Sequence, residues 1–387
     1  MTERYQDLID KRTFGGKILQ LDVIKDGFDL PSFARVEPLD QTTFELFSEV
    51  LFQPETKRKQ RYTVAELQKP EQTIHLHFDA ATLSQFFSNE MSSSVAATTP
   101  PRTLAIELRR PSWGEAISLH VSVADGANVE LVFFEKTNPV LAANNGKKPA
   151  VFLSAEVGNQ ATLDMVYLHP LYLEEDGLRQ YLEPQNGVTF LYYGKVARGG
   201  KFRWTSINIG DSLVEKGMVD LVAPRAEVDL GGAAYIPDGC EQFYQYKVRC
   251  RAPKAKAFVR SHGVVDDGGN GRVVSVADIA KGASDAKLRE ENRFITLGKN
   301  ARAYADPTLL IDEYDVEASH AATVGQMDEE AMFYLQSRGL TEDQAKRLVT
   351  AGFLMPLVDR IPQLELRGQL AEILSERMHS LGGVASE

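Results

Sequence analysis

Between Arg102 and Ile311 the sequence alternates between apolar and polar residues, and this alternation constrains the fold more than any other feature. Apolar residues recur at every second position in Leu104–Leu108 and Ile117–Val123, and a similar pattern recurs in Phe202–Ile209. A period of two is typical of strands with one buried face, whereas a helix repeats about every 3.6 residues. Frequent glycine and proline also exclude long helices from this range. We therefore predict that the range folds into short strands joined by turns.

A weak internal repeat indicates how these strands follow one another. Gly126–Leu131, Gly158–Leu163 and Ala223–Val228 each contain a turn residue, then small or polar residues, and then the alanine or valine that starts a strand. Gly298–Ala303 follows the same plan, and Gly282–Ala286 follows it less completely. A small residue after each turn suits a coil in which every rung stacks on the previous one. The repeat predicts a parallel β-helix, and an antiparallel sandwich stays an equal alternative from periodicity alone.

The regions on either side of this core differ from it in composition and periodicity. Residues 1–100 are expected to form an irregular N-terminal α/β region, with an amphipathic helix at Thr42–Phe52 and an exposed linker at Ser92–Pro101. Residues 101–317 are the predicted β-helix core, and residues 318–387 are the predicted C-terminal α-helical region. The chain is therefore expected to be mainly β, with its helices concentrated at the C-terminal end.

Beyond the strand-rich range the apolar pattern changes to a helical period. Carboxylates at Asp328–Glu330 favour the positive end of a first helix, in which Phe333 is expected to face the core. Thr341–Gln344 has the residue types of a capping box for a second helix, which we expect Pro356 to end. A third helix is predicted to begin at Pro362.

The 387-residue chain carries a net charge of −11. Non-specific binding to nucleic acids or anionic membranes needs an excess of Lys and Arg, so the charge argues against both partners. No apolar run approaches the roughly 18 residues of a membrane-spanning helix, and the N-terminus lacks the apolar core of a signal peptide. We therefore expect a cytoplasmic protein. Its two cysteines, Cys240 and Cys250, do not suggest a disulfide framework and are expected to be reduced.

The most informative motif spans Ala318–Gly339 and reads ASHAATVGQMDEEAMFYLQSRG. It resembles the signature of the SufB/SufD family of iron–sulfur cluster assembly proteins, and of its SufD branch in particular. Gly271–Val276 and Asn300–Ile311 resemble two strand segments of the same family. Two positions depart from the family pattern, because Ala318 stands where cysteine is common and Ala321 stands where glycine is common.

The resemblance implies a fold, a role and a set of partners. The family fold is a right-handed parallel β-helix with helical ends, and its members are scaffold subunits without catalytic turnover of their own. A SufD subunit pairs with a SufB-like paralogue, can form a homodimer when isolated, and docks a SufC-like ABC ATPase through its C-terminal helices. The candidate residues for docking the ATPase here are Leu348, Phe353, Leu366 and Leu370.

His320 matches a histidine that the family places at the subunit interface. The resemblance makes it the candidate ligand for iron, or for a transient iron–sulfur cluster shared with a partner, with no cofactor bound tightly to the isolated chain. The chemistry fits, because neutral imidazole is a common iron ligand and histidine can replace cysteine at some clusters. The motif contains no thiol, so sulfur ligands have to come from the partner.

Two other interpretations of the chain stay open. A β-helix can also carry a carbohydrate-active enzyme, but such a site needs clustered acidic or basic residues on one sheet face, and the sequence shows no such ladder. Alternatively, the chain is a structural paralogue in which His320 binds nothing. His75 and His77 are a possible metal pair on one strand face, but an isolated His-x-His pattern is more often simply a polar strand face. His169 is expected to be structural, and His262 is expected in a turn.

Overall fold

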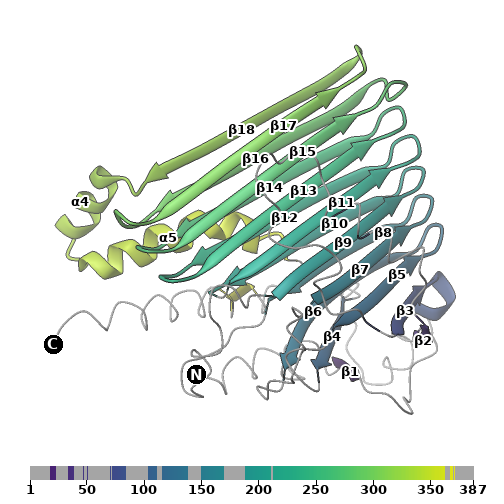
Figure 1. Ribbon diagram of the computed structural model, residues 1–387, viewed down its shortest axis with the longest axis horizontal. Coiled ribbons are helices and arrows are strands. Elements are labelled where there is room, and N and C mark those ends of the chain that lie inside the picture. Colours follow the sequence, from purple (N-terminus) through teal and green to yellow (C-terminus); the bar gives the residue numbers. More distant parts are fainter. Residues whose placement is uncertain are drawn as a thin grey trace, which may run out of the picture.

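The computed structural model describes residues 18–22, 34–38, 47, 50, 70, 72–83, 103–110, 116–137, 150–169, 188–210, 212–361, 367, 368 and 370. Within them the chain forms two nine-stranded sheets that enclose the main apolar core (Figure 1). From the fifth strand onward, each strand lies in the same sheet as the strand two places earlier and pairs with it in parallel. The predicted parallel β-helix is therefore confirmed, and the antiparallel sandwich is excluded.

We call the two sheets A and B. Sheet A contains, in spatial order, β1 (Ile18–Asp22), β4 (Thr103–Arg110), β6 (Asn128–Thr137), β8 (Thr162–Leu168), β10 (Lys201–Ile209), β12 (Glu227–Ile236), β14 (Lys256–Val265), β16 (Ala286–Thr296) and β18 (Val316–Gln326). Sheet B contains, in the same direction, β2 (Ala34–Pro38), β3 (Gln72–Phe78), β5 (Ile117–Val123), β7 (Ala150–Val157), β9 (Val188–Val196), β11 (Leu213–Leu221), β13 (Glu241–Cys250), β15 (Asn270–Ile279) and β17 (Arg302–Ile311). β2 and β3 pair in the antiparallel direction. One strand of each sheet makes one rung, and β17 and β18 make the last rung.

The turns explain why small residues recur along the chain. At six turn positions of the described chain a residue with a left-handed backbone conformation, such as Gly126 with φ +70° or Arg225 with φ +62°, is followed directly by an alanine. A methyl group is small enough to point into the interior immediately after such a sharp change of direction. Each of these alanines is buried, namely Ala127, Ala161, Ala226, Ala255, Ala283 and Ala286. The prediction of a small inward residue after the turn is thus confirmed.

Two described helices follow the last rung. In α4 (Glu329–Ser337) the side chain of Asp328 caps the first turn, but none of the helix residues is buried. Phe333 is 74 % exposed, so the prediction that it faces the core is wrong. Apolar spacing identifies the face of a helix that can be buried, but it does not supply a second surface to cover that face.

The second described helix, α5 (Glu342–Val358), begins with the predicted capping box between Thr341 and Gln344. Pro356 does not end α5, which continues for two residues beyond it. A proline so close to the C-terminus removes one intrahelical hydrogen bond while its fixed φ stays helical, so the last turn tolerates it. The prediction that α5 ends at this proline is therefore wrong.

α5 lies against the outer face of sheet A, where it crosses β12 and β14 (Figure 1). Its buried residues join outward-facing residues of the strands in a second apolar cluster, which includes Ile207, Tyr235, Val264, Leu354 and Leu357. Polar contacts also fix this position. Arg360 donates to a carboxylate oxygen of Asp229 at 2.8 Å and to its backbone oxygen at 3.0 Å.

His262 also holds α5 on the β-helix. It lies in β14 rather than in the predicted turn, and its Nδ1 atom donates to the backbone oxygen of Phe353 at 2.9 Å. The two rings also stack, with their centroids 5.0 Å apart. The turn was predicted because Gly263 follows His262. In the structure Gly263 lies in the strand, and its lack of a Cβ atom leaves room for the ring of Phe294 inside the coil.

The two ends of the chain are described only in part. Phe47, from the expected helix at Thr42–Phe52, is buried against Phe152 with ring centroids 5.2 Å apart, and the expected linker at Ser92–Pro101 lies outside the described residues. At the other end, β18 crosses the expected boundary between residues 317 and 318, so the β-helix continues to Gln326. In the described part of the chain, no helix is both long and apolar enough to span a membrane.

Candidate functional site

The last rung leaves the β-helix open at one end (Figure 1). β17 pairs with β15 and β18 pairs with β16, and within the described residues each has a strand on one side alone. The opposite edge of each strand therefore presents backbone N–H and C=O groups that another strand can pair with. Open strand edges of this length are unusual unless another chain covers them.

His320 lies in the middle of β18, with its side chain on the interior face of the coil. Val316 and Ala318 pack against the main core, and side chains alternate along a strand, so the side chain of residue 320 points the same way. The ring is exposed because it belongs to the last rung, not because it points outward. The sequence-predicted site residue thus lies at the open end of the described coil.

The side chains around His320 are mostly small and apolar. Ala303, Ala305 and Leu309 of β17 pack against the same core from the opposite sheet, and Ala322 follows two positions after His320 on the same face of β18. Most of these side chains are alanine methyl groups, which leave room for another strand to approach. The imidazole is the one group among these interior-facing residues of the last rung that can bind iron.

Glu290 lies directly beneath His320, and the sequence analysis missed it. The two residues are register partners in β16 and β18, so their side chains share the interior face. Glu290 is 1 % exposed, and within the described residues neither carboxyl oxygen has a hydrogen-bond partner at ordinary distance. Burial raises its pKa to about 8, while the Ser275 hydroxyl acts in the opposite direction. The sequence could have predicted a buried carboxyl group here. Leu288 faces the core, and in an alternating strand the residue two positions later, Glu290, faces the same way.

A second buried carboxylate, Glu215, lies further inside the coil and is fully satisfied. The indole Nε1 atom of Trp204 donates to it at 3.2 Å, and the hydroxyl of Ser206 donates at 2.5 Å. The Nε2 atom of His169 lies 3.2 Å from the same carboxylate. His169 is therefore held in a closed hydrogen-bond network, which agrees with its expected structural role and contrasts with the open environment of Glu290.

The described residues do not form a metal site by themselves. No group of three or more His, Cys, Asp or Glu side chains within them could hold a metal ion. Cys250 is buried in the core, which raises its thiol pKa to about 12 and disfavours the thiolate that binds metals. Among the described residues, His320 is therefore not part of a complete set of metal ligands.

The other candidate metal pair, His75 and His77, shares the outward face of β3 as predicted. The His75 ring lies 5.1 Å from that of His120 and its Nε2 atom is 3.4 Å from a carboxylate oxygen of Glu37. His77 contacts the hydroxyl of Ser122 at 2.8 Å instead. Burial lowers the pKa of both His75 and His120, so the neutral rings form a polar strand face rather than a closed ligand set.

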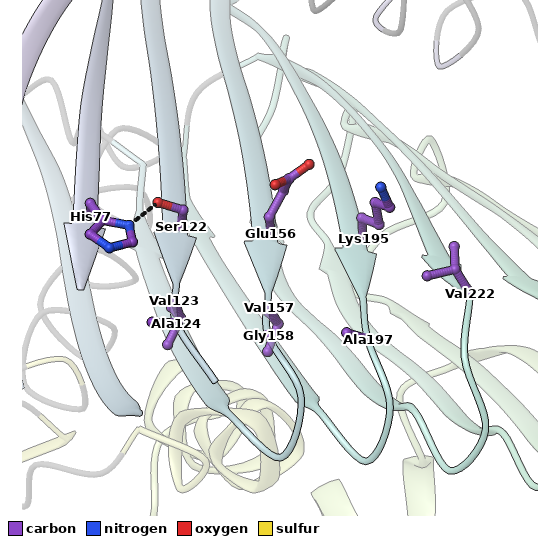
Figure 2. Close-up of a pocket in the computed structure, with 10 residues that line it drawn as sticks. All are labelled: His77, Ser122, Val123, Ala124, Glu156, Val157, Gly158, Lys195, Ala197 and Val222. Atoms are coloured by element: carbon purple, nitrogen blue, oxygen red, sulfur yellow. Dashed lines mark hydrogen bonds between the residues drawn. The ribbon is translucent and has the colours of Figure 1, made fainter. Parts of the chain in front are cut away.

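A hollow of about 230 Å³ lies near the same end of sheet B, far along the sheet from the last rung. Figure 2 shows Ser122, Glu156 and Lys195 on successive strands along this hollow, with His77 at one side. Among the described residues that line it, Glu156 is the one acidic residue. Glycoside hydrolases use a pair of carboxyl groups, which this hollow does not provide. The carbohydrate-active alternative therefore gains no support here.

The four candidate ATPase-docking residues lie in different environments. Leu348 is 54 % exposed on α5, whereas Phe353 is partly buried against sheet A and Leu370 is only 1 % exposed in the same cluster. Leu366 lies outside the described residues. Leu370 is therefore covered by this chain itself and cannot meet an ATPase without moving. Two other exposed large side chains, Phe333 and Tyr334, lie on α4, which contacts α5.

Comparison with known proteins gives consistent matches to one family. The chain is 38 % identical over 124 residues to the iron–sulfur cluster assembly protein SufD of Bacillus subtilis, a match that covers 32 % of this chain and 28 % of that protein. It is 27 % identical over 196 residues to the SufBD family protein Mb1497 of Mycobacterium bovis, covering 48 % of this chain and 49 % of that protein. A similar match to Mb1496 of the same organism covers 22 % of that protein. The chain thus spans half or less of the length of these relatives.

The family described as "SUF system FeS cluster assembly, SufBD core domain" matches residues 116–353. This segment contains β5 to β18, both described helices up to Phe353, and the histidine of the last rung. Because the match covers more than half of the 387 residues, this chain belongs to the SufBD family of iron–sulfur cluster assembly proteins.

Proposed function

We propose that this chain is a scaffold subunit for iron–sulfur cluster assembly, and that it contributes His320 to a cluster or to iron at an interface with another subunit. The observation that carries the proposal is the position of His320, which lies on the interior face of an open last rung and beneath no further strand of the described chain. Membership in the SufBD family supports this role. The iron and sulfide are cargo that passes through the complex, so the subunit has no turnover of its own.

The proposed partner at the open end is a SufB-like paralogue, or a second copy of this chain when the paralogue is absent. The unpaired edges of β17 and β18 support either arrangement, because both sheets of a related β-helix could continue from them. The small side chains around His320 support close contact. A paralogue with cysteine at its own interface would supply the sulfur ligands that this chain lacks.

The proposed second partner is a SufC-like ABC ATPase, which would dock on α4 and on the exposed side of α5. Phe333, Tyr334 and Leu348 support this surface, because each is more than half exposed although all three are large and apolar or aromatic. The opposite side of α5 is fixed to sheet A through Phe353 and Arg360. Motion of a bound ATPase would therefore reach the β-helix through a firmly attached helix.

Co-purification tests the two proposed partners. The full-length chain is expected to capture both a SufB-like paralogue and the ATPase from co-expression, and Leu348→Asp is expected to lower ATPase capture about tenfold while paralogue capture stays unchanged. A buried charge at the centre of an interface costs more than about 1.4 kcal/mol, which is a factor of ten in affinity. The matched control is Lys346→Asp, which also introduces an acidic residue on α5, at a partly exposed position whose side chain is already charged and pairs with Glu342.

Failure of the wild-type chain to capture either partner counts against the scaffold role. Equal loss of ATPase capture in both α5 variants would instead indicate a general charge effect and would remove Leu348 from the docking surface. Circular dichroism and thermal unfolding of both variants show whether α5 stays folded.

A further inference from the structure

The carboxyl group of Glu290 is buried, but the described part of the chain does not provide the hydrogen-bond partners that a buried carboxyl group needs. Within the described residues it is buried without a hydrogen-bond partner for either oxygen. Such a group costs free energy, whether it is ionised or neutral, unless a partner satisfies it. The hydroxyl of Ser275 accepts from the amide of Asn292 at 2.7 Å, and its single hydrogen can serve at most one of the two carboxyl oxygens of Glu290. A buried polar group left open in this manner points to a partner that arrives from elsewhere.

The register limits which group that partner can be. On the inner side, Glu290 is paired with Val259 of β14, which has no polar side-chain atom. On the outer side it is paired with His320 of β18, which has two ring nitrogens. Paired residues of neighbouring parallel strands lie about 4.8 Å apart and share a face, so the carboxyl can reach the imidazole by side-chain rotation alone. No described residue hydrogen-bonds the His320 ring, which is free to make this contact.

We propose that Glu290 is a positioning residue for His320, and that its carboxyl oxygen accepts the N–H of one ring nitrogen while the other nitrogen is turned toward the open end of the coil. This inference rests on the proposed role of His320 as a ligand. A hydrogen bond of this kind fixes the tautomer and the orientation of a ligating imidazole. The carboxyl group of Glu290 has an oxygen that can accept this hydrogen bond whether the group is ionised or protonated. The side-chain amide of glutamine has a similar shape and the same acceptor, so Glu290→Gln can keep the hydrogen bond.

The direct test is the ring tautomer of His320 in the isolated full-length chain with ¹⁵N-labelled histidine rings. The spectrum of His320→Ala identifies the signal. Wild type and Glu290→Gln are expected to show one fixed pair of ring ¹⁵N shifts, whereas Glu290→Leu is expected to move them toward the mixed tautomers of free imidazole. Leucine in place of an unpartnered buried carboxyl is expected to fold, and Glu290→Ala serves as a second variant if leucine does not fit.

The matched control is Glu291→Leu, which removes the next carboxylate along β16 on its opposite, outward face. It is expected to leave the His320 shifts unchanged. Unchanged His320 ring shifts in Glu290→Leu would overturn the inference. Equal changes of these shifts in Glu290→Gln and Glu290→Leu would also overturn it, because glutamine is expected to keep the hydrogen bond to His320.

Cluster yield on the complex gives the second readout. Glu290→Leu is expected to lower it about tenfold, the usual size of an effect through a ligand's hydrogen-bond partner, and Glu290→Gln is expected to restore most of it. The two possible failures are distinguishable. If His320→Ala leaves the yield unchanged, the ligand role fails while the tautomer result stands. If His320→Ala lowers the yield and Glu290→Leu changes neither readout, only the positioning role fails.

Discussion

Replacing His320 by alanine is expected to lower the yield of iron–sulfur cluster on the reconstituted complex at least tenfold, on the order of the loss seen when a metal site is disturbed even indirectly. The reason is that no other interior-facing side chain of the described last rung can bind iron, since its neighbours are residues such as Ala318, Ala322 and Leu309. The measurement is the iron and sulfide content of the purified complex after assembly, together with its visible absorption.

Ser319→Ala provides the matched control for this change. Ser319 precedes the histidine in β18, is similarly exposed and points to the outer face. The control complex is expected to assemble the same amount of cluster as the wild type. Wild-type yield from the His320→Ala complex, with normal assembly of the subunits, would show that the chain is a structural paralogue in which this ring binds nothing.

Gly217→Ala is expected to destabilise the β-helix by about 3 kcal/mol, the upper end of the usual cost of overpacking a core. Gly217 lies in β11 beside its register partner Tyr192, and a Cβ atom at this position would lie only 1.8 Å from Cζ of the tyrosine ring. The ring is fully buried among Trp204 and Phe190, so it cannot move aside without displacing other aromatic side chains. Denaturant unfolding of the full chain measures the loss.

The control for this change is Gly325→Ala. Gly325 also lies in a strand, but no atom comes within 4 Å of a Cβ built at its position. Alanine there restricts the unfolded chain and is expected to leave stability unchanged or raise it by about 0.5 kcal/mol. Equal stability of the two variants would mean that the interior around Tyr192 is more loosely packed than the structure indicates.

The part of the fold that follows from local physics could be predicted from the sequence. Alternation over Ile117–Val123 predicted a strand with one buried face. The small residue after each turn, such as Ala161, suited a coil, although periodicity alone left an antiparallel sandwich as an equal alternative. The capping box at Thr341 also depends only on neighbouring residues. The resemblance of the segment around His320 then led to the correct family, which periodicity could not have done.

The features that were missed depend on contacts between distant segments. The sequence did not show that Phe333 of α4 stays exposed among the described residues, or that Leu370 is buried in the apolar cluster between α5 and sheet A. His262 looked like a turn residue because glycine follows it, yet that glycine is needed for the ring of Phe294. Glu290 could have been noticed as a charged residue at an inward position, but only the strand register pairs it with His320.

The most direct test of the central claim, that another subunit covers the last rung, is amide hydrogen exchange of β17 and β18. It should compare the isolated chain, diluted until sedimentation shows a monomer, with the purified complex that contains the SufB-like paralogue. The account predicts that the backbone amides of Arg302–Ile311 and Val316–Gln326 become strongly protected in the complex, because their open edges acquire partners. Unchanged exchange in both strands, in a complex whose mass shows both subunits, would contradict it.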